Sequence, residues 1–469
     1  MAEKNTDIPE NRCGYVLEFG EMNFIGDRSA WIERTNPVCC WRSVWKSHDE
    51  TERCIWHADV DEKPLTELIT RRGNDAERLD GAILRNLPKK GEMLSLGGCT
   101  LLGARLSNSE FQNVDFSNTD LSGADFTDAN LQYTDFTDAE LEGTGFRRAT
   151  ITQANFTGAT ITRSGFIEAD LHGANFTDSD LSGADFTDAD LRWGDLTDSF
   201  LRTADFTDAD LQDADLSDAD ARYAKFRHAT LQDAVFTRTD CRDVTFTSTL
   251  LYDTVFSDTR INSKTIFFNP KTTFYDSIMS RPSCIYEENP HIAEQLPKNI
   301  HPLEAAKWVY RRLEILHEEN ALSEEAREFH ISKEEVERAL YWKRGKYGPW
   351  GVKTLMWHLT RHGESVKRVL TWWGGVILSS GLLFAGLGGV RDSTNTEYAI
   401  TSLSQLWTIA GWQEVLMNIY FSITTFSTIM DGGLAPAGNG MRVIVAIESI
   451  IGALLVALLV FVLGRRTAR

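Results

Sequence analysis

The residues best placed to do chemistry lie in one short stretch, TTFSTIMDGGLAP, at residues 424–436, between two apolar stretches near the C-terminus. Asp431 supplies a carboxylate, and the glycines beside it allow backbone conformations that turn carbonyl oxygens toward one side. Oxygens of both kinds hold cations in membrane pores. The stretch therefore predicts a cation site, centred on Thr428, Ile429, Met430, Asp431, Gly432 and Gly433.

A second group of candidate ligands lies in the first hundred residues, where VCCWRSVWKSHDETERCIWH places Cys40, Cys54 and His57 close together. Cys54 and His57 have the spacing of a metal-binding knuckle, and Cys13 is available as a fourth ligand. Zn²⁺ takes such mixed sulfur and nitrogen ligands in a tetrahedron. A second knuckle is missing, so structural zinc and an ordinary core of buried thiols and histidine both stay open.

The cysteines and the N-terminus predict a reducing cytoplasm for the N-terminal part. The seven cysteines are an odd number and are scattered, and the opening MAEKNTDIPENRC lacks the apolar core of a signal peptide. No phosphate loop, nucleophile elbow or paired acid/base motif stands out. We therefore predict no enzymatic activity.

Two apolar stretches must position the candidate cation site in a membrane. Residues 369–390 carry no charge and would span about 33 Å as a helix, and residues 443–463 resemble them with one carboxylate, Glu448. The only lysine or arginine residues between the two spans are Arg391 and Arg442. The positive-inside rule therefore predicts that both termini are cytoplasmic. The basic residues that flank the two spans on their other sides are Lys343, Arg344, Lys346, Lys353, Arg361, Lys367 and Arg368 before the first span, and Arg465, Arg466 and Arg469 after the second.

The segment between the spans is too elaborate for two plain anchoring helices, which are the alternative. Residues 412–428 predict a short amphipathic helix, the 428–433 loop follows at once, and Gly452 interrupts the second span. This order resembles the two-helix pore of potassium channels over residues 369–469. The resemblance implies a homotetramer, filter carbonyls that replace the water around an ion, and a hinge at Gly452. We expect Glu448 to pack behind the loop, near backbone amides or hydroxyls of residues 424–428, because lipid would be costly for it.

The loop departs from the potassium-channel pattern at two positions. Met430 stands where the first filter glycine would be, and a Met does not adopt left-handed φ cheaply. Asp431 replaces the aromatic residue that props the filter, and four-fold symmetry would make a ring of carboxylates. Thr428 and Gly432 keep the anchoring positions. The loop therefore predicts a weakly selective pore for monovalent cations.

From about residue 101 to 261 an apolar residue recurs at every fifth position, and a small residue, usually alanine, precedes it by two places. A period of five fits neither a helix nor a strand. It fits a square coil with one large and one small side chain pointing inward from each five-residue side. Such a unit cannot bury its apolar side chain alone, so coils must stack.

The run ADFTDADLRWGDLTDSFLRTADFTDADLQDADLSDAD resembles pentapeptide-repeat proteins, whose fold is a right-handed quadrilateral β-helix. The resemblance implies about 33 repeats in about eight coils. Phe and Leu alternate, which predicts two opposite walls of stacked Phe and two of Leu. Ala221 and Cys241 fall at inward positions and are expected to leave local under-packing. The register points Leu181, Phe186, Leu191 and Leu201 inward, and Asp188 and Asp208 outward.

The negative charge is concentrated in this repeat. Residues 101–260 hold 30 acidic and 12 basic side chains, a net of −18, against −20 for the whole chain. We expect a strongly hydrated surface adapted to high salt, where charge repulsion is screened, and a halophilic, haloarchaeal source. The alternative is an acidic rod that mimics DNA, although no nucleic-acid partner is expected.

The chain is thus predicted to be multidomain, with a cytoplasmic β-helical solenoid, a helical linker and a two-span α-helical pore domain. The domains are residues 1–98, a Trp- and Cys-rich cap of the β-helix; 99–266, the β-helix; 267–299, a loop linker; 300–345, a helical hairpin resembling the tetratricopeptide type; 346–368, a basic juxtamembrane segment; and 369–469, the pore domain.

These features predict a homotetrameric, weakly selective cation channel of the cell membrane, with a large cytoplasmic repeat assembly of regulatory or scaffolding role. Its partners would be the lipid bilayer, permeant cations and three further copies of the chain, and a cytoplasmic protein partner stays open. The alternative, from another class, is a membrane-anchored acidic binding scaffold, DNA-mimicking or not, whose membrane part only oligomerises it.

Overall fold

The computed structural model describes residues 95–267, 300–426, 433–437 and 439–468, with isolated residues between 56 and 85 and Leu296. The chain divides into two compact units, Met1–Phe329 and His330–Arg469, and the division falls within helix α4 (Ser323–Lys343). Each unit is described by itself.

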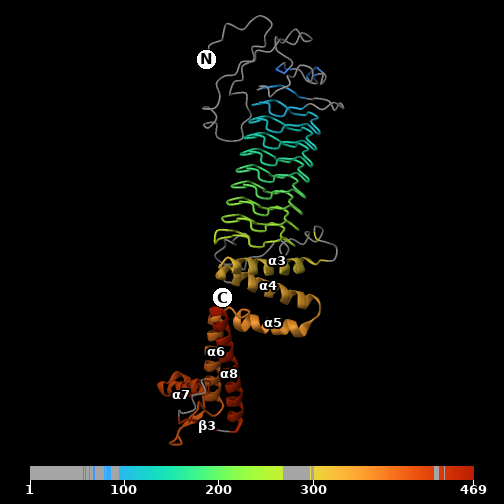
Figure 1. Cartoon of the computed structure of the whole chain (residues 1–469). Coiled ribbons are helices and arrows are strands. Elements are labelled where there is room, and N and C mark those ends of the chain that lie inside the picture. Colours follow the sequence, from blue (N-terminus) through green and yellow to red (C-terminus); the bar gives the residue numbers. More distant parts are fainter. Residues whose placement is uncertain are drawn as a thin grey trace, which may run out of the picture. The chain divides into compact units, whose positions relative to one another are not determined.

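The first unit contains a solenoid of parallel coils (Figure 1). Except at the two ends of the β-helix, bridges join residues 20 positions apart, as in Asp185↔Asp205 and Asp190↔Asp210. A coil is therefore four sides of five residues, as the sequence predicts. The register is also confirmed: Leu181, Phe186, Leu191 and Leu201 are buried, and Asp188 and Asp208 are exposed.

Two columns of Phe rings fill the interior from opposite walls. Within a column the rings stack at 20-residue spacing, as Phe166 does on Phe186 at 4.8 Å. Across the interior the two columns meet edge to face, as Phe166 does with Phe176 at 6.2 Å. The predicted Phe walls are thus present, and Leu196 and Leu216 interrupt one of them.

Many acidic residues of the repeat have a local structural role that the sequence analysis did not assign. Throughout the regular coils, the second residue after a large inward side chain has left-handed φ, for example 58° at Asp188 and 60° at Asp208. Asn and Asp tolerate this conformation better than other side chains except glycine. Asp185, just before an inward residue, accepts hydrogen bonds from the Thr187 backbone N (3.0 Å) and hydroxyl (2.6 Å). The aspartates therefore shape the turns as well as hydrate the surface.

The described residues of the N-terminal segment contact the first coil. Ile83 pairs with Arg105 in a parallel bridge, and its backbone N donates to the Trp56 carbonyl at 2.7 Å. The buried Lys63 ammonium bonds the carbonyls of Trp56 and Ile83. These residues lie where the sequence analysis places a cap.

At the other end the β-helix runs one residue further than predicted. Thr245 pairs with Ile266, a spacing of 21, so the last coil holds one extra residue. The insertion turns Ile266 outward, where it is 40% exposed, and buries Phe267 on Phe246 at 4.9 Å. Phe267 therefore belongs to the β-helix, not to the linker.

Helix α3 (Pro302–Glu319) covers this last coil. Just after it, the Asn320 side chain donates to the Thr259 carbonyl at 2.9 Å and accepts from the Ile261 backbone N at 3.0 Å. The His317 ring lies against Phe267 at 5.5 Å, and burial lowers the pKa of His317. Helices α3 and α4 lie where the sequence predicts two helices, and Asn320 between them bonds backbone groups of the last coil.

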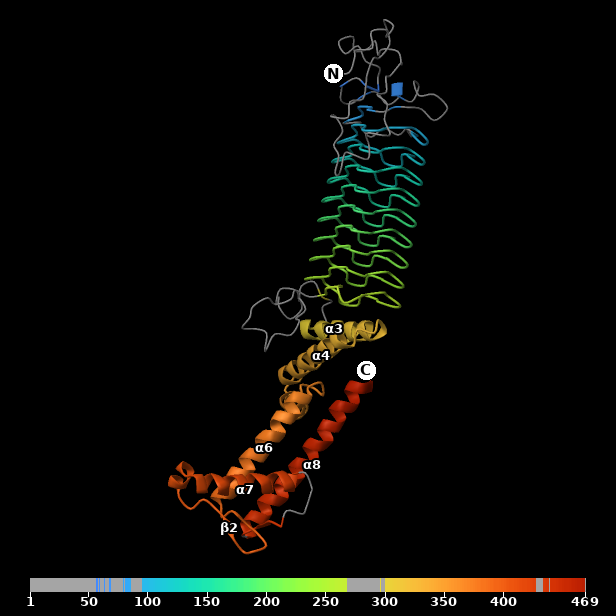
Figure 2. The ribbon, with the colours of Figure 1, turned by 90° about the vertical axis from the view of Figure 1, so that its left-hand side faces the viewer.

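The second unit is helical, with a small antiparallel sheet of order β2-β1-β3 (Figure 2). Two of its helices are long and apolar enough to cross a membrane, Val366–Gly386 and Met441–Arg465. Its elements in chain order are α5 (Tyr347–Thr360), α6 (Val366–Gly386), β1 (Val390–Arg391), β2 (Glu397–Tyr398), η4 (Leu403–Trp407), α7 (Ile409–Phe426), β3 (Ala435–Pro436) and α8 (Asn439–Ala468).

Several helix boundaries differ from the sequence prediction. Helix α6 ends at Gly386 and not at Val390, because Gly388 and Gly389 adopt φ of 121° and 72° and lead into β1. Helix α7 begins three residues before the predicted 412, and α8 begins four before the predicted 443. Helix α5 falls in the segment predicted only as basic and juxtamembrane.

Candidate ion-conduction site

Helix α7 packs against both membrane-spanning helices (Figure 2). Phe421 of α7 meets Phe384 of α6 edge to face at 5.8 Å, and Phe426 stacks on Trp373 at 5.5 Å. Phe384 and Phe421 belong to a buried cluster with Val390 and with Met441 of α8. A short apolar helix is thus held between the two spans, as the predicted pore helix requires.

The filter-like loop follows α7 directly, and its flanks are held in place. Thr428, Ile429, Met430, Asp431 and Gly432 lie outside the residues that the structure describes. Gly433 is exposed with φ of 64°, and Leu434 packs on the buried cluster. Beyond it β3 pairs with β1. Phe426 before the loop and Leu434 after it are therefore both packed.

Glu448 is buried between helices, with only 2% of its surface exposed. Its Oε1 accepts a hydrogen bond from the Ser422 hydroxyl of α7, and that hydroxyl also lies 3.0 Å from the Ile377 carbonyl of α6. As predicted, Glu448 contacts a hydroxyl group of the helix that precedes the loop. This contact falls two residues before the predicted window, 424–428, of which residues 427 and 428 lie outside the described residues.

Gly452 lies where α8 passes the C-terminal end of α7. A Cβ at this position would stand 3.0 Å from the Phe426 carbonyl oxygen and 3.2 Å from its ring. The missing side chain therefore permits close contact between the second span and the residue that precedes the loop. The predicted hinge at Gly452 stays a prediction.

The C-terminal end of α8 is fixed by a polar cluster that the sequence analysis missed. Arg465 Nε lies 3.1 Å from Glu364, and an Arg465 amino group lies 2.8 Å from His330 Nε2 of α4. His362 Nδ1 lies 4.0 Å from Glu334, and burial lowers the pKa of His362 to about 4. His362 is therefore neutral at pH 7. The sequence signals only basic flanks here, not these pairings.

Of the four proposed zinc ligands, the structure describes only His57. Cys13, Cys40 and Cys54 are outside the described residues, and His57 is buried. Among the residues that the structure does describe, no group of three or more His, Cys, Asp or Glu could hold a metal. Cys241 is a free, buried thiol of the β-helix, and burial raises its pKa.

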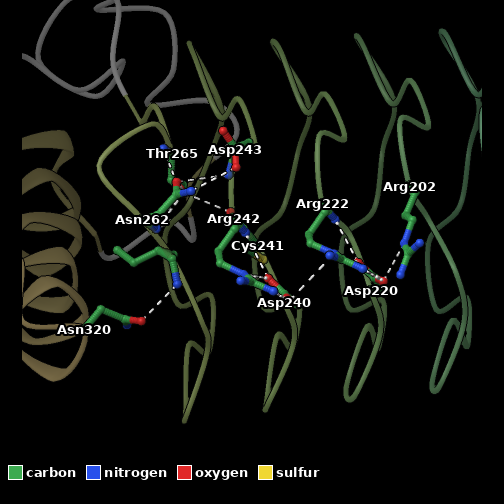
Figure 3. Close-up of polar contacts among 11 residues, drawn as sticks. Arg202, Asp220, Arg222, Asp240, Cys241, Arg242, Asp243, Asn262, Thr265 and Asn320 are labelled. Atoms are coloured by element: carbon green, nitrogen blue, oxygen red, sulfur yellow. Dashed lines mark hydrogen bonds and ion pairs between the residues drawn. The ribbon is translucent and has the colours of Figure 1, made fainter.

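The acidic surface of the β-helix is partly neutralised by a ladder of arginines (Figure 3). Asp220 accepts from Arg202 at 2.6 Å and from Arg222 at 2.8 Å, and Asp240 accepts from Arg242 at 2.6 Å. Burial alone would raise the pKa of Asp220, but the two arginines outweigh it and lower the pKa to about 2. The arginines therefore offset part of the negative charge on this face.

Comparisons with known proteins divide the chain in the same way. The family described as "Pentapeptide repeat region" matches residues 159–236, and "Pentapeptide repeats (8 copies)" matches residues 95–128 and 124–163. The family described as "Ion channel" matches residues 396–469. None of these three is an enzyme family. A search of curated proteins finds no match.

Similar solved structures cover the repeat. HetL of the cyanobacterium Nostoc sp. strain PCC 7120 is 23% identical over 41% of this chain and 81% of its own, with a TM-score of 0.17. QnrB1, a plasmid-mediated fluoroquinolone resistance protein, is 18% identical over 40% and 92%, with a TM-score of 0.23. A pentapeptide repeat protein of the Arabidopsis thaliana thylakoid lumen is 32% identical over 27% and 66%, with a TM-score of 0.12. The family matches alone show a pentapeptide-repeat β-helix and an ion channel domain joined in one chain.

Proposed function

We propose that the protein is a homotetrameric, weakly selective cation channel with a cytoplasmic repeat assembly. The observation that carries the proposal is the position of α7. It is held between the two spans and ends at Phe426, two residues before the loop that contains Asp431. The C-terminal end of a helix carries partial negative charge, which favours a cation near the loop.

Four copies would cover apolar surface that a single copy leaves open. Leu416, Tyr420 and Ile423 of α7 are exposed, as are Ile447 and Leu454 of α8. Lipid can cover the outer faces of the spans, but α7 lies between them and requires a neighbour on its open side. Closed four-fold symmetry would bring one Asp431 from each copy to a common axis.

Weak selectivity follows from the loop composition. A ring of Asp431 carboxylates would concentrate cations and exclude anions. Met430 does not supply the conformational freedom of a glycine, so a full cage of carbonyls that favours potassium over sodium is not expected. Monovalent cations of both kinds should therefore pass.

The test is the reversal potential of the purified protein in planar bilayers, under opposed potassium and sodium gradients. We expect cation currents with poor discrimination between the two ions, and a lower conductance for Asp431→Asn. Glu397→Gln is the matched control, because this exposed carboxylate pairs with Arg391 outside the loop. Strong potassium selectivity would overturn the weak-filter assignment. Anion currents, or no current in any condition, would instead favour the membrane-anchored scaffold.

We place the β-helix in the cytoplasm, as a regulatory or scaffolding element. The polar cluster around Arg465 supports a regulatory role, because it ties the end of α8 to α4 through His330. Helix α4 also follows α3, which covers the β-helix. Arg465→Gln should change the open probability and leave the reversal potential unchanged. An unchanged open probability would remove this link, and protease protection of the repeat in sealed vesicles tests its side of the membrane.

Structural zinc at Cys13, Cys40, Cys54 and His57 also stays a proposal. Buried His57 is compatible with a ligand or with a simple core position. Purified, unchelated protein should carry about one zinc per chain. Elemental analysis that finds none would leave the buried-thiol alternative.

A further inference from the structure

Three arginines recur once per coil along one edge of the β-helix (Figure 3). Arg202, Arg222 and Arg242 each take the first turn position after an inward residue, and we call them the arginine edge. Phenyl rings at the same 20-residue spacing stack 4.8 Å apart, which is the height of one coil. Phe200 and Tyr223 flank the arginines in sequence and are 49% and 55% exposed. Arginine and aromatic residues are enriched in protein interfaces, so this edge has the composition of a docking surface.

The arginine edge has an excess of positive charge. Its three guanidinium groups share two carboxylates, those of Asp220 and Asp240. The further carboxylate at this edge, Asp243, is paired with Lys264 at 3.5 Å. Arg260, in the next coil, is exposed and forms no ion pair with the described residues. A guanidinium group carries several N–H donors, so an arginine bound to Asp220 or Asp240 retains donors for a second carboxylate.

A column of aspartates with the same spacing lies on another edge. Asp213, Asp233 and Asp253, which we call the aspartate edge, take the second turn position after inward residues, with φ of 59°, 60° and 62°. Their turns follow those of the arginine edge by half a coil, so the two edges are diagonally opposite on the four-sided β-helix. Trp193 holds the same position in the preceding coil and is 62% exposed.

The aspartate edge lacks a cation within the described part of the chain. Asp233 and Asp253 are exposed, Asp213 is half-buried, and none of the three forms an ion pair with a described residue. Burial and the negative charges of Asp253 and Asp213 raise the pKa of Asp233. The three carboxylates therefore repel one another, and a row of cations with the same spacing would offset that repulsion.

The two edges match coil for coil, because both repeat once per coil. In two parallel β-helices at the same height, each arginine of one copy is half a coil, about 2.4 Å along the axis, from an aspartate of the other. An arginine side chain is long enough to cover this offset, and its guanidinium fork can bind a carboxylate through two hydrogen bonds. A shift by one coil keeps the match and sets Arg202 against Trp193, where a cation–π contact is favourable.

We propose that the arginine edge of one copy docks on the aspartate edge of a second copy, so that β-helices of separate molecules lie side by side. The two edges differ and are diagonally opposite, so the contact is heterologous, and its repetition gives an open row and not a closed ring. The contact is thus separate from the four-fold contact of the membrane domains proposed above. It requires neither ion conduction nor a tetramer, so it can stand if the channel proposal fails.

The first test is sedimentation velocity of the full-length protein in detergent. At low salt the wild type should form species larger than its smallest stable oligomer, and these should dissociate near ~1 M salt, where charges are screened beyond about 3 Å. The triple variant Asp213→Asn, Asp233→Asn and Asp253→Asn should associate roughly tenfold more weakly, because it loses three exposed ion pairs. Asn tolerates left-handed φ, so the turns should be kept.

The matched control is the triple variant Asp188→Asn, Asp198→Asn and Asp208→Asn. It removes the same charge from the same turn position at the other edges, with φ of 58°, 57° and 60°, and should associate at least as well as the wild type. Equal weakening in both triple variants would show a general effect of net charge and overturn the proposal. Wild-type association by the first triple variant, or no larger species of the wild type at low salt, would also overturn it.

The second test reverses the charge of each edge. One variant carries Asp213→Arg, Asp233→Arg and Asp253→Arg, and the other carries Arg202→Glu, Arg222→Glu and Arg242→Glu. Arginine is tolerated at the second turn position, since Arg148, Arg163 and Arg238 adopt φ of 53°, 57° and 59° there. Each variant alone should remain at the smallest oligomer, because its two edges carry like charges, and an equal mixture should form the larger species. Two variants that are folded by circular dichroism but stay apart when mixed would overturn the pairing of these edges.

Discussion

The β-helix and the membrane unit place the same residue types on opposite sides. In the β-helix the large apolar side chains point inward and the carboxylates point outward. In the membrane unit Leu454 and Ile447 of α8 point outward, and the carboxylate of Glu448 lies inside. The difference reflects the solvent. In water, the burial of apolar surface is favourable. Lipid is as apolar as these side chains, so the exposure of a polar group to lipid is what costs free energy.

The two units also differ in how their stability is distributed. In the β-helix each coil repeats the bonds of the one before, as Phe186 N does to Asp205 O at 2.7 Å and Phe206 N to Lys225 O at 2.7 Å. In the membrane unit a few unique contacts join the helices, such as Ser422 with Glu448 and Gly452 with Phe426. Single substitutions should therefore weaken the packing in the first unit, and should displace one particular helix contact in the second.

The largest expected effect is on the Phe column. Phe186→Ala should destabilise the β-helix by about 3–5 kcal/mol, because the ring is fully buried and stacked on both sides. Phe200→Ala is the matched control, because this ring is outward and 49% exposed, and it should cost less than about 1 kcal/mol. Hydrogen exchange of the coils around residue 186 measures both. Equal protection in the two variants would contradict the inward register.

The next effect concerns the buried carboxylate of the membrane unit. Glu448→Leu should destabilise the packing of α7 by about 1–3 kcal/mol, since it leaves the Ser422 hydroxyl without this partner. Glu448→Gln keeps an acceptor and should cost less. The measurement is the thermal stability of the protein in detergent. If the Leu variant were as stable as the wild type, the Ser422 contact would not hold α7 in place.

The comparison also explains what the sequence could predict. The β-helix register can be predicted because inward residues such as Phe186 recur at every fifth position. A register shifted by one residue would turn many apolar side chains outward. The one-residue insertion before Phe267 breaks that period and has no sequence signal of its own. Helix α5 was not predicted because Gly348, Pro349 and Gly351 are residue types typical of loops. Its apolar residues follow a helical spacing only after these three.

The membrane unit was predictable in order but not in contacts. Span length, loop motif and the costly carboxylate indicate α6, α7 and α8 in sequence, and Glu448 as a buried group. The partner of Glu448 depends on the helical phase of α7 relative to α8, which composition does not encode. Ser422 could be found only from the packed helices. The pairing of Arg465 with His330 depends in the same way on tertiary packing across more than a hundred residues.

A smaller effect should appear on acidification of the β-helix. The folded pKa of Asp220, about 2, lies below its ordinary value, so its ion pairs stabilise above about pH 4 and are lost as the pH falls through 2. Solvent screening limits the contribution to about 1 kcal/mol. A variant with both Arg202→Gln and Arg222→Gln should lose that stability at neutral pH and show a flatter profile between pH 4 and 2. Urea unfolding at several pH values measures the difference, and parallel profiles would contradict the assignment.

The smallest predicted effects have opposite signs at two equivalent positions. Burial raises the pKa of Asp210, and the nearby charge of Asp190 adds to it, so its charged form costs stability at pH 7. At Asp205 burial also favours the neutral form, but hydrogen bonds from Lys225 and Thr207 outweigh it and lower the pKa. Asn is tolerated at this position of the repeat, since Asn155 and Asn175 accept the same turn hydrogen bonds. Asp210→Asn should therefore stabilise the β-helix, and Asp205→Asn should destabilise it, each by about 0.5 kcal/mol at low salt. Both differences should shrink at high salt, because these side chains are partly exposed and their interactions are screened. If both variants changed the free energy of unfolding in the same direction, pairing with a basic side chain would not explain why Asp205 stabilises the β-helix and Asp210 destabilises it.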